Sequence, residues 1–230
     1  MSGMGEALEI DRADAASRFA PHEALAARLL TALAFEASDG SHDLAHILRV
    51  WANASRIAAS EARCDGELLV AAVILHDCVA AEKNSPQRAT VSRLAAARAR
   101  QIAAELGWPS PRLEALAHAI EAHSFSAGIE PRSLEARILQ DADRLDAIGA
   151  IGIARCFYVA GRLGLALYDE QDPSAKGRNL NDRRYALDHF AVKLLKIAPA
   201  LRTEAGRAMG RERDTLLRRF LADLRGEVTG

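Results

Sequence analysis

Cysteine is scarce in this chain, with three among 230 residues, and Cys64, Cys78 and Cys156 lie far apart. No CxxC pair occurs, which excludes a zinc knuckle and a disulfide framework and favours free thiols in a reducing compartment. The sequence also lacks an apolar run of the ~20 residues that a membrane-spanning helix needs. Its N-terminus lacks the long apolar stretch of a secretion signal. We therefore expect a cytoplasmic protein without a membrane segment.

Aromatic residues are also few, at 5%, while half of the residues are hydrophobic and alanine and leucine dominate. That composition, with abundant arginine and glutamate, favours helices over strands. The formal net charge of −1 gives no general attraction to duplex nucleic acid or to an anionic membrane. No alternating strand pattern, internal repeat or composition change marks a second domain. The sequence predicts a single-domain all-α helical bundle in residues 21–230, after an extension at 1–20 that is flexible or forms a short leading helix.

Capping residues, glycine and proline predict where the helices begin and end. Asp39-Gly40-Ser41 separates the first two helices, Asp65 or Gly66 begins a very apolar third helix, and Gly107-Trp108-Pro109 ends the fourth. The polar stretch 168–181 is long for a loop and is therefore a candidate functional segment. The expected helices cover residues 21–37, 41–58, 65–77, a stretch after 87 up to 106, 110–124, 133–165 (kinked at Gly149 or Gly152), 182–198 and 203–226.

His76 and Asp77 end the most apolar run of the sequence, Leu68 to Leu75. An aspartate in the last turn of a helix opposes the helix dipole by a few tenths to ~1 kcal/mol, and burying its charge without a partner costs more. A bound cation relieves both penalties. Read alone, the pair is either half of a metal site or a solvated helix end.

Two further histidines lie one turn apart on the helix that follows Ser41. At ~100° per residue, His46 falls at the edge of the apolar face, half turned toward the core as a metal ligand is. His42 lies four residues earlier, so both side chains could line one pocket. A surface position near the start of the helix suits His42 equally well.

Three acidic residues, Asp141, Asp143 and Asp146, interrupt an otherwise apolar helix. A helical wheel places Asp141 in the main apolar arc and Asp143 along a seam of alanines that permits close helix contact. The wheel alone slightly favours Asp141 as a buried ligand and leaves Asp143 open.

A histidine on one helix, a His-Asp pair ending a later helix, and a distant aspartate in an Ala-Asp-x-Leu setting resemble the HD-domain metal-dependent phosphohydrolases. The chain is most similar to a bacterial group of stand-alone HD proteins, and the resemblance covers roughly residues 35–225. The resemblance implies an HD-type helical bundle with the metal ligands His46, His76, Asp77 and Asp143, the last being marked by its Ala-Asp-Arg-Leu-Asp-Ala context. The other matching segments are Lys83-Asn84-Ser85-Pro86, His123-Ser124-Phe125-Ser126, Asp141 to Gly149, and Arg184-Tyr185-Ala186-Leu187-Asp188-His189-Phe190.

The resemblance implies an enzyme with a divalent metal ion. Two imidazoles and two carboxylates suit Mn²⁺ first, with Mg²⁺, Co²⁺, Ni²⁺ and Fe²⁺ as alternatives. Such an ion activates a water molecule and polarises a phosphoryl oxygen, and Asp77 counts among the catalytic residues.

The substrate class follows from which relatives the chain resembles. Monophosphate nucleotidases of this superfamily often carry a glutamate shortly after the His-Asp pair, whereas Cys78, Val79, Ala80 and Ala81 follow it here. The Gly-Tyr-Pro signature of cyclic-dinucleotide phosphodiesterases is absent from the sequence. The stand-alone group implies hydrolysis of a nucleoside triphosphate to the monophosphate and pyrophosphate. The alternatives are a di-iron HD oxygenase and a non-catalytic nucleotide- or metal-binding module.

Basic residues near the ligands are candidates for neutralising phosphate charge. Lys83 follows the His-Asp pair by a short loop, so its ammonium can reach a phosphate, and we expect it to take part in catalysis. Arg88 and Arg144 either bind phosphate or are solvated.

Two further groups of side chains are candidates for the substrate pocket. His123 lies on the apolar side of its helix, where it would bind phosphate, donate a proton, supply another ligand or fill the core. Tyr185, His189 and Lys193 are spaced four residues apart and either wall the pocket or form a solvated stripe. The expected partners are a nucleotide or another phosphate ester and a second copy of the chain. The substrate-binding candidates are His42, Lys83, Arg88, His123, Arg144, Tyr185 and His189.

Overall fold

The computed structural model describes residues 12–33, 44–79, 90–124 and 127–229. Within these ranges the chain forms α-helices and short 3-10 helices and no β-strand, with a single β-bridge between Ala166 and Tyr185. The all-α prediction is confirmed. The elements are α1 Arg12–Ser17, α2 Glu23–Ala32, α3 Leu44–Ala58, α4 Gly66–Leu75, α5 Val91–Glu105, α6 Ser110–His123, α7 Leu134–Asp146, α8 Gly149–Arg162, α9 Asp188–Val192, η3 Leu194–Lys196, η4 Ala198–Ala200 and α10 Glu204–Thr229.

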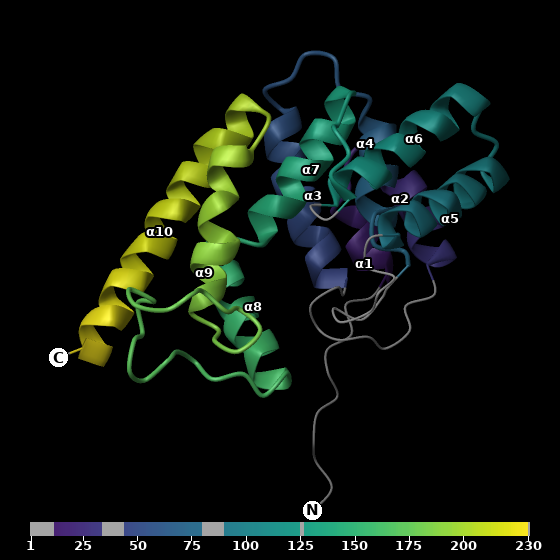
Figure 1. The fold of residues 1–230 in the computed structure, drawn as a ribbon. Helices are drawn as coiled ribbons and strands as arrows, with labels where there is room; N and C mark the ends of the chain where they lie inside the picture. The colour runs from purple at the N-terminus through teal and green to yellow at the C-terminus, as the bar shows by residue number, and fades with distance from the viewer. Residues whose placement is uncertain (1–11, 34–43, 80–89, 125–126, 230) are drawn as a thin grey trace, which may run out of the picture.

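Helix α7 lies at the centre of the bundle. It packs against α3 and α6, and it also contacts α4 and α10. In Figure 1, α5 and α6 lie on one side of α7, and α9 and α10 lie on the other. Helix α1 comes from the predicted N-terminal extension and packs against α2. Next to it Phe19 is buried and stacks on Trp51, with ring centroids 5.2 Å apart, so this part of the extension is continuous with the core.

Helix α4 carries the most apolar run and is buried on every side. Its N-terminus is capped by Asp65, which accepts a hydrogen bond from the Leu68 amide at 3.0 Å, so the predicted start is confirmed. Every residue from Leu68 to Leu75 is buried, as is typical of a helix that others surround. The helix ends at Leu75 with His76 as its C-cap residue. The packing of α4 therefore fixes the place where His76 and Asp77 emerge.

The prediction of a single kinked helix over 133–165 is wrong, because Ala147 and Ile148 separate two helices. Ile148 is extended, and Gly149 has a φ of +77°, in the left-handed region that favours glycine. The break ends α7 directly after Asp146 and lets α8 pack against α10.

The predicted helix over 182–198 is also wrong. Residues 182–187 form turns, and α9, η3 and η4 follow as short separate helices. Buried Asp188 accepts hydrogen bonds from the Asn181 amide at 2.6 Å and from the Arg178 guanidinium at 2.6 and 2.9 Å. These bonds hold the chain before α9 in a loop rather than in a helical turn. Pro199, which has no amide hydrogen to donate, lies in η4.

The stretch expected to be a loop, 168–181, contains no helix. Asp172 accepts hydrogen bonds from the amides of Lys176 and Gly177 at 2.9 and 2.7 Å. The Arg178 guanidinium lies 4.6 Å from the centroid of the Tyr185 ring and joins the loop to the bridge at Ala166. Side chains of the loop itself therefore order it.

Candidate metal centre

Four side chains that the sequence singles out meet between α3, α4 and α7. His46 comes from α3, His76 and Asp77 follow the last turn of α4, and Asp143 comes from α7. Nε2 of His46 lies 3.3 Å from Nε2 of His76. It also lies 3.7 Å from Oδ2 of Asp77 and 3.6 Å from Oδ1 of Asp143. Nε2 of His76 is 3.5 Å from the same oxygen of Asp77, so His46, His76 and Asp77 face one another and Asp143 joins them through His46.

Both imidazole rings are held by their other nitrogen. Nδ1 of His76 lies 2.8 Å from the Val73 carbonyl oxygen, which can only accept, so this nitrogen carries the proton. Nδ1 of His46 donates in the same way to Oδ2 of Asp146 at 2.8 Å. In the neutral rings both Nε2 atoms therefore present lone pairs to each other across 3.3 Å. Burial lowers the pKa of His76, so a metal ion suits the space between them better than a proton does.

The spacing of the donor atoms also fits a metal ion. Two ligand atoms that each lie about 2.1 Å from an ion are about 3.0–3.4 Å apart at octahedral or tetrahedral angles. Among His46, His76 and Asp77 the separations of the donor atoms run from 3.3 to 3.7 Å, so these three residues form a compact set of ligands. Oδ1 of Asp143 lies 3.6 Å from Nε2 of His46, and its side chain is 29% exposed, which leaves it room to adjust toward an ion.

The sequence reading missed the role of Asp146. This carboxylate is buried and pairs with His46, with Arg49 (Nε to Oδ1, 2.8 Å) and with Arg155 (Nη1 to Oδ2, 3.2 Å). Burial alone would raise the pKa of Asp146, but hydrogen bonds from His46 and Arg49 and the charge of Arg49 hold the pKa far below its usual range. An ionised carboxylate at Nδ1 fixes the tautomer and the direction of the His46 ring. The sequence offered one indication of this role: Asp146 lies three residues after Asp143 and so on nearly the same face of the helix.

His123 brings a third imidazole to the cluster. Its Nδ1 donates to the Ile120 carbonyl oxygen at 2.5 Å, and its Nε2 lies 3.6 Å from Oδ1 of Asp77. The ring meets the His76 ring edge-on, with centroids 5.0 Å apart. Burial opposes protonation of His123, but the hydrogen bond and charge of Asp77 and the charge of Asp143 outweigh it and raise the pKa. Asp77 thus faces the two other histidines with one oxygen and His123 with the other.

Asp141 is buried, as the helical wheel predicts, but it lies away from the cluster. It accepts hydrogen bonds from the amides of Arg202 and Thr203, at 2.9 and 2.7 Å, and from the Thr203 hydroxyl at 2.7 Å. Gly206 leaves room for this carboxylate, because a Cβ there would lie 2.5 Å from Oδ2. Asp141 therefore anchors the start of α10, and of the two aspartates it is Asp143 that faces His46.

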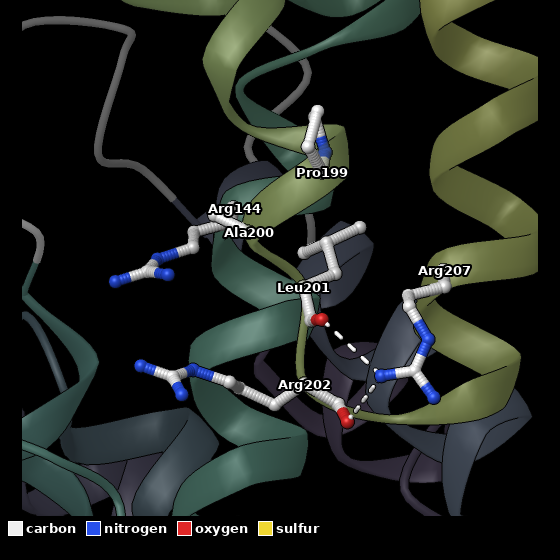
Figure 2. Close-up of a pocket in the computed structure, with 6 residues that line it drawn as sticks. All are labelled: Arg144, Pro199, Ala200, Leu201, Arg202 and Arg207. Carbon is white, nitrogen blue, oxygen red and sulfur yellow. Dashed lines mark hydrogen bonds between the residues drawn. The ribbon is translucent and has the colours of Figure 1, made fainter.

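Arg144, the residue after Asp143, lines an open pocket together with Arg202 and Arg207. Figure 2 shows the Arg144 and Arg202 guanidinium groups extending to the same side of the chain. Burial lowers the pKa of Arg144, and the positive charge of Arg202 acts in the same direction. Two arginines from separate elements are thus close enough to influence each other.

Tyr185 lies in the turns before α9, and His189 lies in α9 itself. The Arg178 and Arg184 guanidinium groups lie 4.6 and 5.1 Å from the centroid of the Tyr185 ring, and His189 Nδ1 pairs with Asp182 at 2.9 Å. The expected helical stripe with Lys193 is wrong, because the turns at 182–187 break the spacing. Three other candidates, His42, Lys83 and Arg88, lie outside the described residues.

The chain is similar in sequence and in fold to several known proteins. Residues 43–148 match the family described as HD domain. The Bacillus subtilis (strain 168) protein YpgQ is 31% identical over 193 residues, which are 82% of this chain and 85% of YpgQ. The crystal structure of YpgQ in complex with ADP is similar with a TM-score of 0.66 and 28% identity, covering 94% of this chain and 96% of that one.

Two further crystal structures share the fold. A Lactobacillus plantarum protein is similar with a TM-score of 0.70 and 31% identity, over 90% of this chain and 97% of that one. An HD-superfamily hydrolase from Bacillus thuringiensis has a TM-score of 0.66 and 28% identity, over 90% and 97% of the two chains.

Among the described residues of the present chain, no helix has the length and apolar character needed to cross a membrane.

Proposed function

This chain belongs to the HD-domain family, as the pattern of its sequence predicts, and we propose that it is a metal-dependent hydrolase of nucleoside triphosphates. The products are a nucleoside monophosphate and pyrophosphate. The observation that carries the proposal is the pair of Nε2 atoms of His46 and His76, which face each other with lone pairs beside two carboxylates. The ADP complex of YpgQ supports a nucleotide as the ligand.

His46, His76, Asp77 and Asp143 would hold the metal ion. Their mixed nitrogen and oxygen donors suit Mn²⁺, Mg²⁺, Fe²⁺, Co²⁺ or Ni²⁺, and Mn²⁺ is our first choice. When bound, such an ion lowers the pKa of a water molecule and polarises a phosphoryl oxygen. Asp146 keeps His46 in the tautomer that this task requires.

His123 is the proposed proton donor. Its Nδ1 is occupied by the Ile120 carbonyl, so a proton on Nε2 points toward Asp77 and the centre of the cluster. The raised pKa favours the protonated ring, which can deliver that proton to the oxygen that leaves the phosphorus. Lys83 stays a sequence-based prediction in this scheme, as the residue that neutralises phosphate charge.

A panel of nucleotides with several divalent ions tests the proposal, with phosphate and pyrophosphate measured separately. We expect pyrophosphate from triphosphates and its loss, by at least about 100-fold, in Asp77→Asn, because one metal ligand and the carboxylate that pairs with His123 are removed together. Asp223→Asn is the matched control, since Asp223 is 65% exposed on α10. Inertness of the wild-type protein toward the whole panel contradicts the proposal.

His123 also favours a second candidate, the di-iron oxygenase, because a third imidazole beside Asp77 adds a nitrogen donor that a second ion requires. Metal analysis of the purified protein separates the two. About two iron atoms per chain with oxygen-dependent turnover support the oxygenase, whereas one ion per chain with pyrophosphate release supports the hydrolase.

A further inference from the structure

An open pocket is lined in part by Arg144, the residue that follows the proposed ligand Asp143. It has a volume of about 550 Å³, and small-molecule sites range over about 300–1,000 Å³. One wall is Arg144, which directly follows Asp143 on α7. The other lining residues come from η4, from the segment that follows it and from the first turn of α10. The lining residues are Arg144, Pro199, Ala200, Leu201, Arg202 and Arg207.

The three arginines of the pocket have different roles. Arg207 donates hydrogen bonds to the carbonyl oxygens of Leu201 and Arg202, at 3.4 and 2.8 Å, and so supports the backbone. Figure 2 shows its guanidinium on one side of this segment and those of Arg144 and Arg202 extending away on the other. Arg144 and Arg202 are therefore the pair that presents positive charge to a ligand.

The backbone that carries Arg202 is fixed relative to the metal centre. Its amide donates to both oxygens of Asp141, at 2.9 and 3.0 Å, and Asp141 lies on the same helix as Asp143. Helix α7 thus sets the separation between the ligand set and both arginines.

The Arg202 guanidinium can exchange its partner. Its Nη2 lies 2.8 Å from Oε2 of Glu130, and the two side chains are 40% and 69% exposed. Ion pairs with this much exposure are weak, because water screens both charges. An anion with several charges can therefore displace Glu130 from Arg202.

We propose that Arg144 and Arg202 bind the terminal phosphates of the nucleoside triphosphate, the part of the substrate that leaves as pyrophosphate. This inference rests on the proposed function of the adjacent metal centre. Guanidinium groups bind phosphate oxygens in a bidentate manner, and two of them suit a chain of phosphates. In this proposal the pair selects triphosphates, because a monophosphate has no terminal phosphates for the two arginines to bind.

Calorimetric titration with inorganic tripolyphosphate tests the pocket without catalysis, on full-length protein in the presence of EDTA. Arg202→Ala should weaken binding about 10–100-fold, the range expected for a lost charge-assisted hydrogen-bond pair. Glu130→Gln should tighten binding several-fold, because it removes the competing carboxylate. Arg219→Ala, which removes an arginine that is 81% exposed on α10, should leave binding within about twofold.

Steady-state kinetics give the second measurement. Arg202→Ala should raise KM for triphosphates, whereas the control Arg219→Ala should leave both kcat and KM unchanged. Arg202→Lys should restore part of the loss. Equal effects of Arg202→Ala and Arg219→Ala, or weaker binding in Glu130→Gln, overturn the inference, and Glu130→Gln decides the matter if Arg202→Ala does not fold.

The two proposals fail in different ways. If the protein hydrolyses triphosphates and Arg202→Ala does not change the KM, the role of the pocket is wrong and the proposed hydrolase activity is supported. Tripolyphosphate binding that follows the predicted order, without hydrolysis of any nucleotide, supports the pocket as a polyphosphate site and rejects the hydrolase.

Discussion

Replacing Asp146 by asparagine should weaken metal binding although Asp146 is not among the proposed ligands. The carboxylate accepts the Nδ1 proton of His46 at 2.8 Å and so directs Nε2 at the cluster. Asparagine keeps the shape but removes the charge, and its amide can turn to donate, which favours the other tautomer of His46. Loss of such an outer partner weakens metal affinity about 10–100-fold, or about 1.4–2.7 kcal/mol.

The same change should also lower the stability of the metal-free protein. Asp146 pairs with Arg49 and Arg155, whose side chains are 33% and 22% exposed. Breaking a fully buried ion pair costs about 3–5 kcal/mol, and water can partly solvate these two arginines. We therefore expect about 1–3 kcal/mol of lost stability, as for a charged hydrogen bond.

Asp141→Asn is the matched control for this prediction. Asp141 is as buried as Asp146, yet it holds Arg202 and Thr203 rather than a histidine. The Asp141→Asn variant should be less stable than wild type, while its Mn²⁺ affinity stays within about threefold of the wild-type value, which is the usual spread of such measurements. Calorimetric titration with Mn²⁺ and urea unfolding in EDTA measure both quantities. Wild-type Mn²⁺ affinity in Asp146→Asn, or an equal loss in Asp141→Asn, would refute the reasoning.

Two further predictions follow from perturbed pKa values. Burial and the charges of Glu135 and Asp65 raise the pKa of Cys64 to about 11, so iodoacetamide at pH 8 should label it at least about 100-fold more slowly than free cysteine. Peptide mass mapping checks this, and comparable rates would contradict it. The hydrogen bonds and charge of Arg178 lower the pKa of Asp188, so its stabilising effect is present above the unfolded value of about 3.9 and is lost as pH falls below it. Urea unfolding at pH 6 and pH 3 should show a smaller acid-induced loss in Asp188→Asn than in wild type, and equal losses would count against it.

Local pattern was sufficient to find most members of the cluster. His76 and Asp77 stand out because polar groups end a run that the structure buries completely. The pattern could not decide which of Asp141 and Asp143 is the metal ligand. A helical wheel indicates which side chain is more buried, and it does not indicate what a buried side chain contacts. Only the tertiary partners decide, and Asp141 meets the start of α10 while Asp143 meets His46.

The role of Asp146 and the form of residues 182–198 depend on contacts between distant segments. Arg49 and Arg155, the partners of Asp146, come from α3 and α8. Asp188 accepts hydrogen bonds from a loop that precedes it, and these bonds replace the helical turn that the spacing indicates. Neither set of contacts leaves a periodic trace in the sequence.

Helix α7 carries four acidic and basic side chains within six residues, and each one faces different neighbours. Asp141 holds the start of α10, Asp143 and Asp146 serve the cluster, and Arg144 lines the pocket. Inserting or deleting one residue inside α7 rotates every side chain beyond that point by about 100° around the helix axis. The side chains beyond that point would then lose their present partners together. Length changes outside α7 do not rotate these side chains relative to one another. Related proteins can therefore differ in length outside α7, whereas the helix itself has to vary by substitution alone.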